Sequence, residues 1–403
     1  MLIKETPEDF IVREVYNLDG VSAELTDRTA GEFAYFLVEK RNVSTIDAAI
    51  FLAGELGAPT EEVRFAGLKD KQAKTVQVMS APGSYIKKNK LSFSDGRIAA
   101  RFIGFCKDPA TSERLIGNQF DITIRNLTKD AADRFLTGLG EAAEFGIPNY
   151  FDDQRFGAAR SGKGFPALEL VLGDAEEALK LLVATPSTLD SPVFRARKQQ
   201  MERAWGDWRQ CLELSRSRQD REVFESLIKS HGDFREAFRF VPRRERLMQL
   251  FAYQSYLWNR ALSKLIVERC GSNLMDSNLI QMASELGNQP AWRTLTNEEQ
   301  SLWLSTDLPL PDHKTKCKDS AAQAALDAVF AEDGIRGDML RIDGIRGLEF
   351  REEERACILF PDALEADDPI RDDRHDGAWM IEMKLTLPKG AYATLMIKRA
   401  AAI

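Results

Sequence analysis

One aspartate, Asp70, lies among three lysines in the stretch FAGLKDKQAKTVQ, residues 65 to 77. It is the only acidic residue between Glu62 and Asp95. Nearby ammonium groups favour the ionised form of a carboxyl group, so Asp70 is a candidate nucleophile or base. The simpler interpretation is a solvated turn, in which the lysines face water and Asp70 accepts a hydrogen bond from a backbone N–H. The residues alone favour that simpler interpretation.

The segments on either side predict that Asp70 lies in a loop between two strands. A short apolar segment around Val63 and Phe65 ends at Gly67, and residues 75 to 79 alternate as a strand does. A loop of this kind is held in place by the sheet from which it emerges.

The stretch resembles the signature of the TruD family of pseudouridine synthases, G-x-K-D-K-x-A-x-T-x-Q. Further blocks similar to the family follow in the expected order, and the resemblance is weakest between about residues 160 and 380. Seven fixed positions of the eleven match, namely Gly67, Lys69, Asp70, Lys71, Ala73, Thr75 and Gln77. The other blocks are KETPEDFIVRE (4–14), GNQF (117–120), PNYFDDQRFG (148–157), YQSYLWN (253–259) and LPKGAYAT (387–394).

The resemblance implies that Asp70 is the catalytic aspartate and that Lys4 pairs with it. Such a pair would keep the carboxylate ionised and oriented. On the residues alone, Lys4 is an ordinary surface lysine. Lys69 is a poorer partner for Asp70, because neighbours along an extended segment point to opposite sides.

Three further residues match family positions that line the uridine pocket: Phe10, Asn118 and Phe120. An aromatic face can stack on an unstacked base, and an amide can bond a base edge. Without the resemblance, Phe10 and Phe120 are interpreted as core residues. Arg155 is a candidate contact to an RNA phosphate.

The sequence departs from the family pattern at two places. The family usually has glycine where this chain has Asp152, a departure that touches no catalytic position. Bacterial relatives carry an aromatic residue where this chain has Leu385, so a stacking role is not transferred there. The neighbouring aromatics Tyr150, Phe151 and Phe156 are predicted to pack at a domain junction.

Hydrophobic periodicity predicts an α+β fold with a mixed or antiparallel sheet. The resemblance implies a pseudouridine synthase catalytic domain, residues 1–157 and 351–403, interrupted by a mainly helical TruD-type insertion domain, residues 158–350. The predicted strands are 8–16, 32–41, 97–106 and 119–127, and the predicted helices run from Ser44 to Gly57 and from Thr128 to about Phe145. The other predicted segments are helices within 174–268 and over 319–332, and strand-like alternation over 378–399 around a turn at residues 388–390.

Composition restricts the class of protein. A chain of 403 residues should form about two domains, and it has no apolar run of about 18 residues that would span a membrane. Its five cysteines and three histidines are scattered, which argues against disulfides and a metal site, and no glycine pattern for a nucleotide cofactor occurs. The acidic N-terminus does not resemble a signal peptide. We therefore expect a cytoplasmic protein without metal or cofactor.

The charge distribution bears on RNA binding. The net charge is −8, but residues 193–248 contain 14 Lys and Arg against 9 Asp and Glu. This basic run is either an RNA-binding surface or a solvated helix face with i, i+4 ion pairs.

The function that the resemblance implies is isomerisation of one uridine to pseudouridine in folded tRNA, at position 13, by a monomeric enzyme. The closest alternative is the same reaction at another tRNA position or in another RNA. A non-catalytic RNA-binding protein would have lost the nucleophile, which is present. A phosphoaspartyl hydrolase would need D-x-D, and position 72 is Gln. The residues do not decide whether Asp70 attacks the sugar, attacks the base or removes a proton.

Overall fold

The computed structural model describes residues 1–22, 32–86, 91–157, 163–187, 190–275, 279, 289–345 and 347–402. The chain forms two compact units, each with most of its contacts within itself. Residues 1–144 and 360–401 form the first unit, and residues 145–359 form the second. The domain boundaries expected from the sequence, after residues 157 and 350, stay a prediction.

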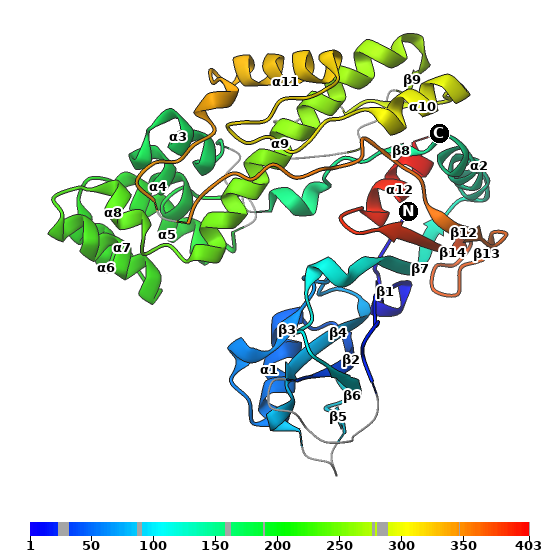
Figure 1. Cartoon of the computed structure of the whole chain (residues 1–403), viewed down its shortest axis with the longest axis horizontal. Coiled ribbons are helices and arrows are strands. Elements are labelled where there is room, and N and C mark those ends of the chain that lie inside the picture. Colours follow the sequence, from blue (N-terminus) through cyan, green and yellow to red (C-terminus); the bar gives the residue numbers. More distant parts are fainter. Residues whose placement is uncertain are drawn as a thin grey trace. The chain divides into compact units, whose positions relative to one another are not determined.

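A ten-stranded mixed sheet dominates the described part of the first unit (Figure 1). Its spatial order is β12-β14-β7-β1-β4-β2-β6-β5, with β13 paired to β14 and β3 paired to β4. The strands are β1 (Phe10–Tyr16), β2 (Phe33–Arg41), β3 (Arg64–Phe65), β4 (Lys74–Pro82), β5 (Ser92–Ser94), β6 (Ile98–Cys106), β7 (Leu115–Leu127), β12 (Asp362–Ala366), β13 (Ile370–Arg371) and β14 (Trp379–Pro388). Strands β1 and β4 are parallel, whereas the neighbouring pairs are antiparallel. The predicted α+β fold with a mixed sheet is confirmed.

Helix α1 (Thr45–Leu56) covers one face of this sheet. The Oγ atom of Ser44 accepts a hydrogen bond from the Asp47 N–H, and Gly57 ends the helix in the left-handed conformation with φ of 71°. These are the start and stop signals that the sequence predicts. The inward face of α1 packs against core residues of β2, so the helix fixes that end of the sheet.

Two more helices of this unit pack against each other, α2 (Lys129–Phe145) and α12 (Ala393–Ala401). A Cβ atom on Gly138 would lie 2.3 Å from the carbonyl oxygen of Ala400. Only glycine permits this approach without displacing backbone.

The strand-like pattern expected over 378–399 is right for β14 and wrong beyond the turn. After the turn the chain forms helix α12 instead of a strand. The buried residues of α12 include Leu395, Met396 and Arg399, and this spacing follows a helical face better than a period of two. The physical reason is that α12 completes a helix pair with α2, which periodicity within a short segment does not reveal.

The second unit is mainly helical in its described residues (Figure 1). Its long helix α9 (Arg243–Cys270) lies beside α11 (Ser320–Glu332). The other helices are α3 (Pro166–Leu172), α4 (Ala175–Val183), α5 (Pro192–Arg203), α6 (Trp208–Leu214), α7 (Arg218–Lys229), α8 (Phe234–Phe238) and α10 (Asn297–Ser305), and the short strands are β8 (Ile147–Pro148), β9 (Leu274–Met275), β10 (Ala291–Trp292) and β11 (Ile358–Leu359). Among the described residues, none of the helices combines the length and apolar character that a membrane crossing needs.

Candidate active site

The parallel pairing of β1 with β4 brings Lys4 and Asp70 together. Lys4 precedes β1 and Asp70 precedes β4, and the starts of neighbouring parallel strands lie at the same edge of a sheet. At this edge the Nζ atom of Lys4 donates to Oδ2 of Asp70 at 2.5 Å. The structure thus forms the pair that the resemblance implies.

The segment that carries Lys4 is anchored on both sides. Two backbone hydrogen bonds join Leu2 to Arg125 of β7, at 2.8 and 2.9 Å. The Nε atom of Arg125 in turn donates to Asp9 at 2.8 Å. Lys4 itself has φ of +61°, a conformation that costs free energy in a residue with a Cβ atom. The two anchors therefore hold a strained backbone that directs the Lys4 amine at Asp70.

The loop that carries Asp70 is held by the residue before it. The Nζ atom of Lys69 lies 2.9 Å from Oε1 of Glu14, in an ion pair whose side chains are 9% and 1% exposed. The backbone N–H of Lys69 also donates to Oγ1 of Thr45 at 2.9 Å. Lys69 therefore binds Glu14 and not Asp70, in agreement with the alternation of an extended segment.

Two aromatic rings adjoin the Lys4–Asp70 pair. The Lys4 ammonium lies 4.0 Å from the centroid of the Phe10 ring, which is cation–π distance. The rings of Phe10 and Phe120 meet edge to face with centroids 5.9 Å apart. Both rings are buried, at 2% and 7% exposure, so the core interpretation of these residues is correct for the free protein.

Asn118 lies on the same face of the sheet as Phe120, two positions away on β7. It is the register partner of Glu14 on β1 and of Leu387 on β14. The Oδ1 atom of Asn118 is buried, and within the described residues no donor reaches it. A Cβ atom on the preceding Gly117 would lie 2.4 Å from the carbonyl oxygen of Leu387, which explains the glycine of the GNQF block.

The pair has the exposure that a reactive carboxylate requires. The side chain of Asp70 is 28% exposed and that of Lys4 is 13% exposed. A ligand can therefore reach the carboxylate, while the amine that orients it lies deeper. An oriented, accessible carboxylate can act as a nucleophile or as a base.

Two residues of this site escape sequence reasoning, namely Glu14 and Lys40. Lys40 is fully buried, and its Nζ atom donates to the main-chain oxygen of Asp70 at 2.7 Å. Each is a charged residue on the apolar face of a predicted strand. That break in the alternation was the available signal.

Arg155 lies in the second unit, on a short 3-10 helix. Its Nε atom donates to Oγ of Ser255 at 2.9 Å, and its guanidinium lies 5.1 Å from the ring centroid of Phe151.

Asp152, the departure from the family glycine, caps that helix by accepting a hydrogen bond from the Asp153 N–H. The φ of Asp152 is −83°, so the turn does not require glycine. Tyr150, Phe151 and Phe156 are all buried within the second unit.

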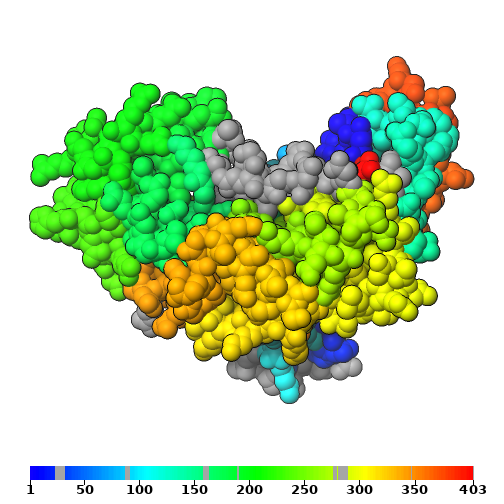
Figure 2. All heavy atoms as spheres, turned by 90° about the horizontal axis from the view of Figure 1, so that it is seen from above, coloured from blue at the N-terminus to red at the C-terminus, as the bar shows by residue number. Residues whose placement is uncertain are grey.

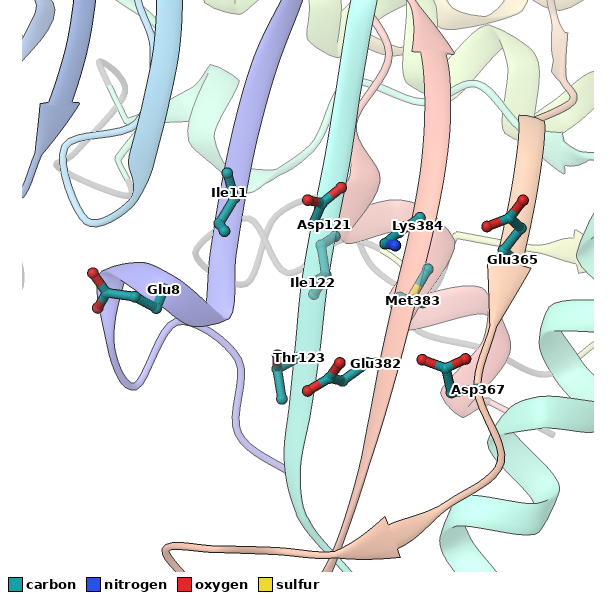
Figure 3. Close-up of a pocket in the computed structure, with 10 residues that line it drawn as sticks. All are labelled: Glu8, Ile11, Asp121, Ile122, Thr123, Glu365, Asp367, Glu382, Met383 and Lys384. Carbon is teal, nitrogen blue, oxygen red and sulfur yellow. The ribbon is translucent and has the colours of Figure 1, made fainter.

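A cavity of about 270 Å³ opens on the other face of the first unit's sheet (Figure 3). Asp121 and its register partner Lys384 line it, whereas Phe120 and its register partner Leu385 point to the face that carries the candidate site. The carboxylates of the lining are Glu8, Asp121, Glu365, Asp367 and Glu382. This surplus of negative charge repels phosphates, so the cavity is unsuited to RNA.

The expected absence of a metal and of a cofactor stays a prediction. Within the described ranges, no cluster of three or more His, Cys, Asp or Glu has the arrangement needed to hold a metal ion.

The family model and two of the relatives match nearly the whole length of this chain. The family model for tRNA pseudouridine synthase D (TruD) matches residues 1–400. A probable tRNA pseudouridine synthase D 1 of Methanococcus maripaludis is 28% identical and covers 99% of each chain. The tRNA pseudouridine synthase D of Aquifex aeolicus is 29% identical, over 98% of this chain and 97% of its own.

A solved structure shares the fold. It comes from Methanosarcina mazei, is described as a candidate tRNA pseudouridine synthase D, and matches with a TM-score of 0.70 at 22% identity. The match covers all of this chain and 93% of that one. From the match of the family model over nearly every residue, the chain belongs to the TruD family of tRNA pseudouridine synthases.

Proposed function

We propose that Asp70 is the catalytic carboxylate of this enzyme and that Lys4 is the partner that orients it. The observation that carries the proposal is the 2.5 Å contact between Lys4 Nζ and Asp70 Oδ2 at the start of two parallel strands. Two segments 66 positions apart meet there, and the lysine has a strained backbone. Strain that the surrounding structure maintains is typical of functional sites.

The proposed reaction needs only what such a site offers. The N1–C1′ bond of uridine breaks, the uracil turns, and C5 bonds to C1′. The proton on C5 is lost and N1 gains a proton, so the substrate and the product are isomers. One carboxylate can assist this sequence as nucleophile or as base, without an oxidant or a group donor.

The base is proposed to bind beside Phe10, Phe120 and Asn118. The open acceptor Oδ1 of Asn118 suits an N–H group of uracil, because a buried acceptor without a donor is costly until a ligand supplies one. A uridine within folded RNA must leave its stack before it can reach such a site.

The second unit is proposed to bind the body of the tRNA. Arg155 is a candidate phosphate contact, and the basic run over 193–248 supplies further positive charge. Figure 2 shows the green segment, which contains this run, gathered on one side of the second unit. We place the enzyme in the cytoplasm, where its tRNA substrate is found, and expect it to act as a monomer.

The target is proposed to be uridine 13 of tRNA, which follows from the resemblance to bacterial members of the family. The same reaction at another tRNA position or in another RNA is the alternative. The decisive experiment maps pseudouridines in total RNA from cells with and without the gene. If only the pseudouridine at position 13 of tRNA disappears without the gene, the proposal is supported. If a pseudouridine at a different site disappears, that site is the target instead.

A further inference from the structure

Lys40 is a lysine whose whole side chain is buried at the end of β2. It shares a face of the sheet with Phe36 and Val38, which belong to the core beneath α1. Strands β2 and β4 are antiparallel, and Lys40 is the register partner of Thr75 at the start of β4. The end of β2 therefore lies at the same edge as the loop that carries Asp70.

Two lysines hold Asp70 at two different atoms. Lys4 donates to the carboxylate, and Nζ of Lys40 donates to the main-chain oxygen of the same residue at 2.7 Å. The charged groups that act on the Lys40 ammonium are Asp70 and Lys69, and Lys69 is itself paired with Glu14. Lys40 is thus directed at the backbone of the proposed catalytic residue.

Burial of an ammonium group is unfavourable unless hydrogen bonds or a paired charge compensate for its lost hydration. A methionine of similar length would fill the same apolar slot without charge, so packing alone does not explain a lysine at position 40. Residues that are unfavourable for folding at their position, such as a buried charge, are common at functional sites.

We propose that Lys40 is a positioning residue whose ammonium fixes the Asp70 backbone and thereby aligns the Asp70 carboxylate for reaction. It acts through Asp70 and does not touch the uridine. The inference rests on the proposed role of Asp70.

The titration of Lys40 gives this role a signature. Burial lowers the pKa of the Lys40 amine to about 8, although the nearby Asp70 carboxylate raises it and Lys69 lowers it. Above pH 8 the folded protein therefore loses this ammonium, and the alignment of Asp70 weakens. The unfolded chain keeps its proton up to the ordinary lysine pKa of 10.5. Because the unfolded state then binds more protons, the contribution of Lys40 to stability rises with pH over the same interval. Activity and stability change in opposite directions.

The test compares Lys40→Met and Lys40→Gln with Lys74→Met as the matched control. Lys74 lies at the start of β4, next to Thr75, the register partner of Lys40. Its side chain is on the opposite face of the sheet, where the amine pairs with Glu39 at 3.1 Å. The rate is single-turnover tritium release from RNA labelled at uridine C5, with enzyme in excess, between pH 6.5 and 9.5. Thermal melts and RNA titrations use the same samples.

We expect Lys40→Met to release tritium at least tenfold more slowly at pH 7, with RNA affinity retained and a higher melting temperature. Lys40→Gln keeps a donor without the charge and should fall between Lys40→Met and wild type. The fall in rate above pH 8 should be present in wild type and in Lys74→Met, and absent from both Lys40 variants.

Three results would overturn the proposal. The first is a Lys40→Met rate equal to wild type, and the second is an alkaline fall that persists in Lys40→Gln. The third is a wild-type rate that stays level over the whole range to pH 9.5, which counts against the proposal even where a variant does not fold. A wrong assignment of Asp70 can be distinguished from a wrong role for Lys40, because in that case Asp70→Asn would still release tritium.

Discussion

The Nζ atom of Lys4 and the Oδ2 atom of Asp70 lie 2.5 Å apart, on two segments that precede parallel strands. The two segments have separate supports: Arg125 anchors the Lys4 segment, and Glu14 anchors the Asp70 loop through Lys69. The contact is therefore a consequence of the sheet and not of one flexible loop. Each member of the pair can be tested without removing the support of the other.

Asp70→Asn is expected to abolish turnover while the fold and RNA affinity survive. The amide keeps the shape of the carboxylate and most of its hydrogen bonds, but it removes the charge and the nucleophilic oxygen. Tritium release from RNA labelled at C5 measures the reaction, and RNA titration measures binding. Release at the wild-type rate would refute the assignment.

Lys4→Met is expected to slow the same single turnover, but less than Asp70→Asn does. The substitution removes the group that orients the carboxylate and leaves the reactive oxygen in place. Glu5→Gln is a suitable control, because Glu5 adjoins Lys4 and contacts His375 instead of Asp70. If both variants slow the reaction equally, the loss reflects damage to the N-terminal segment and not a role of Lys4.

Much of this site could be predicted from the sequence, because its loop carries a dense signature. The pairing of Lys4 with Asp70 came from the resemblance, whereas its physical cause, the parallel register of β1 and β4, did not. Register depends on contacts between distant segments, which periodicity does not encode. Lys40 breaks the apolar alternation of its strand, but its partner is a main-chain oxygen 30 positions away, which periodicity does not identify.

Replacement of Phe120 can separate packing from stacking. Phe120→Ala should lower the free energy of unfolding by about 3–5 kcal/mol, because the ring is buried against Phe10. Phe120→Leu retains most of the apolar volume, so it should lose less stability than Phe120→Ala. If the ring also stacks on a base, Phe120→Leu should weaken productive binding by about 1–3 kcal/mol. Unchanged RNA titration with Phe120→Leu would leave packing as the whole role of this residue.

Arg125 pairs with the carboxylates of Asp9, Asp372 and Asp373, and this cluster predicts an acid-dependent loss of stability. Burial alone would raise the pKa of the Asp372 carboxyl, but hydrogen bonds from the backbone N–H groups of Asn126 and Arg374 and from Arg125 lower it below 3.8. Because the folded state then binds fewer protons than the unfolded state, this contribution is present above pH 3.8 and is lost as the pH falls through the lower, folded pKa.

Asp372→Asn should therefore lower the free energy of unfolding at pH 7, by about 1.5–3 kcal/mol for the removal of hydrogen bonds to a charged group. The difference from wild type should shrink below pH 4. Urea denaturation between pH 3 and pH 7 measures it. Asp373→Asn is the control, since that carboxylate binds the same arginine but its side chain is 66% exposed. An equal effect of both substitutions would argue against burial as the cause.

The first turn of α9 offers the sharpest test of RNA binding by the second unit. Arg243 and Arg244 are exposed there, at the positive end of a 28-residue helix, where the helix dipole disfavours cations. Burial, followed by repulsion from Arg243, lowers the pKa of the nearby Arg246. These positive charges repel one another in the free protein. A bound phosphate would attract all of them, so the same arrangement favours phosphate binding.

The double variant Arg243→Ala, Arg244→Ala should therefore bind tRNA more weakly, and the slope of log affinity against log salt should fall by about 1 for each phosphate that the variant no longer neutralises. Arg218→Ala with Arg239→Ala is the matched control. It removes the same charge from the same basic run, but Glu222 and Glu236 already neutralise these arginines at 2.7 Å. The control should change the slope little. If both double variants lower the slope equally, the effect reflects net charge alone; if neither changes it, the basic run is a solvated helix face.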